Sequence, residues 1–272
     1  MKRKALLSFI LAAMATMWAG TTQAQEYYDL TIALTQVNSI NCKNLSFIKG
    51  VSGTVKYDDE TKTLTLENAT IVGDKYKTAI SSKIDGLIIK VIGKNKLQTE
   101  TGSGILYENS ITITGGGTLD IECQKNCAIY ANKGNLTIEN CTINAKSKEY
   151  GIAGYNGTTE NLTIKNAAIT AEGTEKGSIC DFATLTMIGS KISEPSGAAF
   201  DPSMHCVALN GEKVTDKVMI VKDATAIETP NNNIAVKTAQ GIYTLSGVRV
   251  SNDLNKLPKG VYIVNGKKVV KQ

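Results

Sequence analysis

Leu-Thr-Ile-Glu-Asn-Cys-Thr-Ile at residues 136–143 returns as Leu-Thr-Ile-Lys-Asn-Ala-Ala-Ile at residues 162–169. The opening triplet of this pattern recurs at intervals of 22 to 26 residues, starting at Leu64, Ile89, Ile111, Leu136, Leu162 and Leu185. Apolar and polar residues alternate inside each copy, which is the period of a strand with one buried face. A repeat of this length is typical of a solenoid, in which each unit packs on its neighbours.

One position of the repeat holds only asparagine or glycine. It lies two residues after the triplet and is occupied by Asn68, Gly93, Gly115, Asn140, Asn166 and Gly189. Glycine has no Cβ, and asparagine tolerates the left-handed backbone better than most residues. The pattern therefore predicts a structural ladder of corners with positive φ.

Two further apolar stretches complete each repeat. One follows the corner, as at Cys141-Thr-Ile143, and the other comes later, as at Ala128-Ile129. Three strands and three bends per repeat predict an all-β chain, built as a parallel β-helix of about six coils of 22–26 residues. We expect an N-terminal β cap over residues 25–55, and the β-helix with its C-terminal cap over residues 56–222.

Residues 1–24 have the layout of a cleavable export signal. Lys2, Arg3 and Lys4 precede an apolar run, and Thr22-Gln-Ala24 supplies small residues for cleavage. Without these three cations the chain carries 27 basic and 25 acidic residues, so it has no electrostatic footprint for nucleic acid. No later apolar stretch is long enough to span a bilayer. We expect a protein of the cell surface or the extracellular space, with the periplasm as the alternative.

The six cysteines would meet an oxidising compartment during export. Cys123 and Cys127 fall in one bend, and Cys180 and Cys206 lie about one coil apart, so these two pairs are the disulfide candidates. Free buried thiols are the alternative. A metal site is not expected, because His205 is the single histidine and the cysteines lack a second close pair. No cofactor is expected either.

The end of the chain differs from the repeats. Residues 223–233 are typical of a linker, and residues 234–272 predict a small antiparallel β domain with hairpin turns at Ser246-Gly247 and Asn265-Gly266. This tail resembles the C-terminal sorting domain of type IX secretion cargo in Bacteroidetes. The matching residues are Gly241, Tyr243, Gly247, Gly260, Tyr262, Gly266, Lys267 and Lys268. The resemblance implies a type IX secretion machinery as partner, passage through the outer membrane and removal of the tail.

The repeats are similar to the right-handed β-helix repeats of secreted bacterial proteins described as carbohydrate-binding, as in the run from Thr61 to Ile71. A rigid rod with polar sides presents long faces at little entropic cost, which suits adhesion or contact with extended glycans. We therefore expect a non-catalytic binding or structural module whose partner is an extracellular glycan or a surface protein. Five aromatic residues near the third strand would form a ledge for sugar rings if they stacked on successive coils: Tyr107, Tyr130, Tyr150, Tyr155 and Phe182. The alternative is an internal aromatic stack.

A polysaccharide lyase or glycoside hydrolase is the alternative function, because the fold often carries such activity. A hydrolase needs two or three carboxylates in one groove, and a lyase needs carboxylates for Ca²⁺ together with a basic proton acceptor. Asp120 and Glu122 are the one close acid pair on a single strand face. Solvated acids are the simpler interpretation, and we assign no catalytic residue.

Overall fold

The computed structural model describes residues 24–73, 78–223, 241–245, 247–251, 253–264 and 267–271. Nearly all of the predicted export signal and linker, and Gly266, lie outside these ranges. The chain divides into two compact units, residues 1–227 and 228–272. Within the described residues, no helix is long and apolar enough to cross a membrane.

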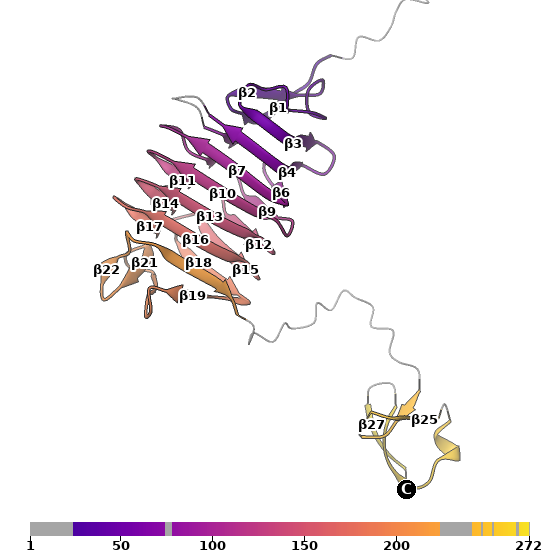
Figure 1. The fold of residues 1–272 in the computed structure, drawn as a ribbon. Helices are drawn as coiled ribbons and strands as arrows, with labels where there is room; N and C mark the ends of the chain where they lie inside the picture. The colour runs from indigo at the N-terminus through magenta and orange to yellow at the C-terminus, as the bar shows by residue number, and fades with distance from the viewer. Residues whose placement is uncertain are drawn as a thin grey trace, which may run out of the picture. The chain divides into compact units, whose positions relative to one another are not determined.

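The larger unit is a parallel β-solenoid of about five turns (Figure 1). Its first face consists of β6 (Leu87–Ile92), β9 (Ile111–Thr114), β12 (Leu136–Glu139), β15 (Asn161–Lys165) and β18 (Thr184–Ile188). Its second face consists of β7 (Lys94–Thr99), β10 (Thr118–Cys123), β13 (Thr142–Ser147) and β16 (Ala168–Gly173). Its third face consists of β5 (Ile80–Ser82), β8 (Ile105–Tyr107), β11 (Cys127–Ala131), β14 (Tyr150–Ala153) and β17 (Gly177–Cys180).

The long strand β4 (Thr63–Val72) joins the first and second faces, because it pairs with both β6 and β7. The predicted parallel β-helix with three strands per repeat is therefore confirmed. The expected six coils become about five, since the last repeat contributes only β18 before the chain enters the cap.

Equivalent residues of successive repeats are direct partners in the sheets. Leu136 pairs with Ile111 on one side and with Leu162 on the other, and Leu162 in turn pairs with Leu185. The side chains of Leu136 and Leu162 point inward and are fully buried. In-register stacking thus makes columns of aliphatic side chains, and these columns form the core.

The corner residues have φ values from 47° at Asn68 to 122° at Gly115, as the restricted composition predicts. Contacts between neighbouring rungs explain why a glycine follows Asn68 and Asn166. The Asn68 side-chain oxygen accepts a hydrogen bond from the Lys94 backbone nitrogen at 3.2 Å. A Cβ at Gly93 would lie only 2.2 Å from that same oxygen. Glycine on one rung therefore makes room for the asparagine amide of the rung beneath it.

Antiparallel strands close both ends of the parallel stack. At the N-terminal end, β1 (Tyr27–Ile32) pairs with β2 (Thr35–Asn38) and β5, and β3 (Val51–Asp58) pairs with β4. The C-terminal cap consists of β19 (Ser190–Glu194), β20 (Ala199–Asp201), β21 (Cys206–Leu209), β22 (Glu212–Lys213) and β23 (Val218–Lys222). Strand β23 pairs with β16, and β21 pairs with β17. These pairings occupy edges that would otherwise be open to other chains.

The smaller unit is an antiparallel sheet with the strand order β25-β24-β26-β27. Its elements are β24 (Ile242–Tyr243), β25 (Arg249–Ser251), the short 3₁₀ helix η1 (Leu254–Lys256), β26 (Gly260–Val264) and β27 (Lys267–Lys271). Tyr262 is buried, and its hydroxyl donates to the Pro258 carbonyl at 2.9 Å. The predicted small antiparallel domain is confirmed, whereas its role in sorting stays a prediction.

Candidate binding groove on the second face

Two columns of polar side chains run along the outside of the second face. Strand register aligns one column of Lys96, Asp120, Asn144 and Thr170, and a second column of Gln98, Glu122, Lys146 and Glu172. The residues between them in each strand, such as Ile121 and Ala145, point inward and are buried. The alternation of the strands therefore presents one polar surface across four successive turns. We call these eight residues the polar groove.

The polar groove is hollowed at two adjoining places. One hollow of about 490 Å³ is lined by Gln98, Glu122 and Lys146 together with the turn residues Glu100 and Gln124. The second, of about 230 Å³, lies over Asp120, Asn144 and Glu172 and shares Glu122 and Lys146 with the first. None of the described residues that line these hollows is aromatic. A ligand here would be held chiefly by hydrogen bonds.

Glu122 lies at the centre of the polar groove and is held by its neighbours on the preceding turn. Its Oε2 atom is 3.0 Å from Lys96 Nζ and accepts a hydrogen bond from Gln98 Nε2 at 3.1 Å. The hydrogen bond from Lys96 is the main reason that the pKa of Glu122 is lowered. Glu122 is therefore an anion at neutral pH. It can accept hydrogen bonds but has no proton to give as a general acid.

The next turns continue the same pattern of paired donors and acceptors. Asn144 Nδ2 donates to Asp120 Oδ1 at 2.6 Å, and Lys146 Nζ lies 3.1 Å from Glu172 Oε1. More than half of the Lys146 side chain is exposed. Such an ion pair contributes little to stability when one partner is largely exposed, so the Lys146 amine remains available to a ligand at small cost.

The five predicted aromatic residues do not form one ledge. Tyr107 and Phe182 are fully buried and fill the core, so no sugar ring can stack on them. Tyr130 and Tyr150 are half-buried on the outside of the third face, and Tyr155 follows them with 60% of its surface exposed. The ledge is therefore corrected to these last three residues, whose role in binding stays a prediction.

All six cysteines are free thiols and are buried. Cys123 belongs to the main core, where its sulfur accepts a hydrogen bond from the Thr99 hydroxyl. Cys127 lies in a separate cluster on the outside of the third face. Cys123 and Cys127 thus belong to different clusters of buried residues, and their pairing as a disulfide stays a prediction. Cys180 and Cys206 share the cluster of Cys127.

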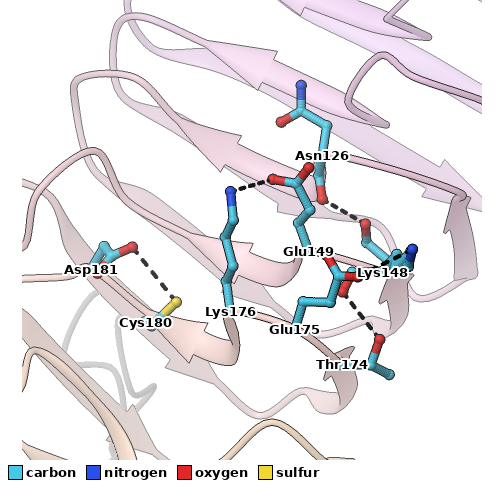
Figure 2. A network of polar contacts seen from close by, with 9 residues as sticks. Asn126, Lys148, Glu149, Thr174, Glu175, Lys176, Cys180 and Asp181 are labelled. Carbon is cyan, nitrogen blue, oxygen red and sulfur yellow. Dashed lines mark hydrogen bonds and ion pairs between the residues drawn. The ribbon is translucent and has the colours of Figure 1, made fainter.

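A second polar network lies at the turns between the second and third faces (Figure 2). Lys176 Nζ is 2.6 Å from Glu149 Oε2, and Lys148 Nζ is 3.1 Å from Glu175 Oε1. Lys176 also lies over the Tyr150 ring, 5.3 Å from its centroid. These contacts link consecutive turns, and each charged side chain has a partner of opposite charge. We interpret this network as structural.

His205 packs on a turn of the solenoid. A Cβ at Gly157 would lie 2.5 Å from its ring, so the glycine makes space for the imidazole. Within the described part of the chain, no three His, Cys, Asp or Glu side chains converge in a way that could hold a metal ion.

Sequence reasoning singled out Asp120 and Glu122 but missed the other six residues of the polar groove. A signal for them was present, because each occupies an outward position in the second strand of its repeat. Lysine, asparagine and threonine at such positions are also ordinary on any solvated strand. Only the register of the sheet shows that they form continuous columns.

Replacing Lys96 with methionine should raise the pKa of Glu122 toward the ordinary glutamate value, because the main group that favours its charged form is removed. Carboxyl-detected NMR titration would measure this shift, with Lys94→Met on the same strand as the control. Because a lowered carboxyl pKa stabilises the fold above the unfolded-state pKa, this small contribution should fade as the pH falls through the pKa of Glu122. Equal titration curves in both variants would contradict the assigned pairing.

No family model, curated protein or solved structure matches this chain. The chemistry of the site therefore rests on its own residues. It comprises two lysines, three carboxylates, two amides and a hydroxyl on the outside of the second face.

Proposed function

We propose that this protein is a secreted, non-catalytic binding module whose polar groove holds an extended, uncharged glycan. The observation that carries the proposal is the pair of unbroken polar columns over β7, β10, β13 and β16. Partners in a sheet repeat about every 4.8 Å. An extended polymer lying across the strands would therefore meet a similar set of polar groups at each turn.

The chemistry of the polar groove favours hydroxyl-rich ligands. Asp120 and Glu122 supply acceptors, Lys96 and Lys146 supply donors, and the Asn144 amide offers both. Sugar hydroxyls also donate and accept, so one ring could satisfy neighbouring groups of both kinds. Lysines and carboxylates are mixed along the groove, which gives no field of one sign. This balance supports a neutral polysaccharide rather than a polyanion.

The rigidity of the solenoid supports binding without catalysis. Groups fixed on a sheet lose little conformational entropy when a ligand docks, and contacts repeated along a polymer add to one another. A glycosidase would need a carboxyl group that is protonated near neutral pH. The lowered pKa of Glu122, caused chiefly by Lys96, disfavours that role.

Retention on immobilised neutral polysaccharides tests this proposal. The purified protein should be retained by at least one of them, equally with calcium and with chelator, and the polymer should keep its length. Lys146→Met and Asn144→Ala should each weaken retention about tenfold, because each removes a hydrogen bond that the ligand would use. Lys165→Met is the matched control, since Lys165 is an ion-paired lysine on the first face, 3.5 Å from Glu139.

Four outcomes would contradict the proposal. Equal retention of the Lys146 and Lys165 variants would place the ligand elsewhere. Loss of retention only in Tyr155→Ala would move the site to the aromatic residues of the third face. Shortening of the polymer, or a calcium requirement, would favour the lyase or hydrolase alternative. No retention by any glycan would favour a structural rod that binds a surface protein.

We also propose that the N-terminal segment directs export and that the small C-terminal unit addresses the protein to the cell surface through type IX secretion. Support comes from the sequence resemblance of the tail and from its fold as a separate compact unit. A chain ending at Ala226 should accumulate in the periplasm, while the full chain reaches the surface. Fractionation with surface protease digestion would measure this. Normal surface display of the shortened chain would contradict the proposal.

A further inference from the structure

Two cysteines face each other where the C-terminal cap meets the solenoid. Cys180 ends β17, the last strand of the third face, and Cys206 begins β21 of the cap. They are direct partners in the antiparallel pairing of these strands. Both side chains have no exposed surface. This one residue pair forms the bridge between the two strands.

The backbone places the two cysteines within disulfide range. Direct partners in an antiparallel ladder have Cα atoms about 4.5 to 5.5 Å apart and project their side chains to the same face. Disulfides in proteins span Cα separations of about 4.4 to 6.8 Å. Both residues also belong to one buried cluster with Cys127, Ala153 and Ala208, against which Tyr130, Tyr150 and Met204 pack.

The other four cysteines are not placed to compete. Cys127 lies on β11, and β14 separates that strand from β17. Two strand spacings amount to about 9.6 Å, which exceeds the reach of a disulfide. Cys42, Cys123 and Cys141 belong to the main core. Cys180 and Cys206 are therefore the two cysteines that the strand pairing places within disulfide reach of each other.

We propose that Cys180 and Cys206 form a disulfide, which covalently joins the C-terminal cap to the last complete turn of the solenoid. The oxidant is a second disulfide, either a small molecule or a thiol–disulfide oxidoreductase. One cysteine thiolate attacks it, forming a mixed disulfide and releasing one thiol. The second cysteine then attacks the mixed disulfide. The S–S bond forms, two protons leave the protein, and two electrons reduce the oxidant to its dithiol form.

The surroundings indicate when this bond forms. Burial raises the pKa of the Cys180 thiol, and the neighbouring Asp181 carboxylate adds to that effect. Cys180 Sγ lies 3.7 Å from Asp181 Oδ2 (Figure 2). A protonated, inaccessible thiol exchanges slowly. Oxidation therefore precedes closure of the cap, and the finished disulfide is shielded from reductants in the folded protein.

Refolding with a defined oxidant tests the proposal without depending on export or on the proposed function. The reduced full chain is refolded with oxidised glutathione, its remaining thiols are alkylated in denaturant, and it is digested with trypsin. Cleavage after Lys191 separates peptide 177–191, which holds Cys180, from peptide 192–213, which holds Cys206. The two should be recovered as one linked species, with the other four cysteines alkylated.

Thermal unfolding provides a second readout. Reduction before refolding should lower the melting temperature by about 5–15 °C, because the disulfide closes a loop within the unfolded chain. Cys180→Ala/Cys206→Ala should abolish this difference, whereas Cys141→Ala, at a buried site in the main core, should preserve it. Alkylation of all six thiols after oxidative refolding would overturn the proposal, and so would a link from Cys180 or Cys206 to any other cysteine.

Discussion

The in-register pairing of successive repeats is the constraint on which the rest of this structure depends. Each strand pairs with its copy one turn away, so every inward side chain lies above an equivalent one. The same register that builds the aliphatic core aligns the outward side chains into columns. A shift of one residue in any strand of the second face would turn its core residues outward and interrupt the polar groove. Fold and candidate site thus rest on one interaction.

Much of the fold could be predicted because the residue types in the repeat have well-defined backbone and burial preferences. The Leu-Thr-Ile alternation predicts the strands, and the Asn or Gly position predicts corners such as Asn140, whose φ is 53°. The number of turns was harder to predict. The copy at Leu185 has the pattern of the others, but the strand that follows its corner, β19, pairs antiparallel with β23 instead of continuing the solenoid. That choice depends on tertiary pairing with residues about 30 positions further along the chain.

The candidate site could be predicted only in part, for reasons of strand parity. Tyr130 follows the inward Ile129 by one residue and faces outward, whereas Tyr107 follows Ile105 by two residues and is buried. Phe182 lies beyond a left-handed corner at Asp181, with φ of 60°, which changes the direction of the chain. Aromatic residues at similar distances from the recurring isoleucine therefore do not lie on the same side of the sheet. Similarly, Cys123 and Cys127 are close in sequence but belong to different clusters of buried residues.

Lysine footprinting tests most directly whether the polar groove is the binding surface. Acetylation of each lysine would be measured by mass spectrometry with and without a retained polysaccharide. If the polar groove binds the ligand, acetylation of Lys96 and Lys146 should slow several-fold, whereas Lys165 on the first face and Lys176 at the turns should react as before. Protection of Lys176 without Lys96 and Lys146, or equal reactivity of all lysines under saturating ligand, would contradict it.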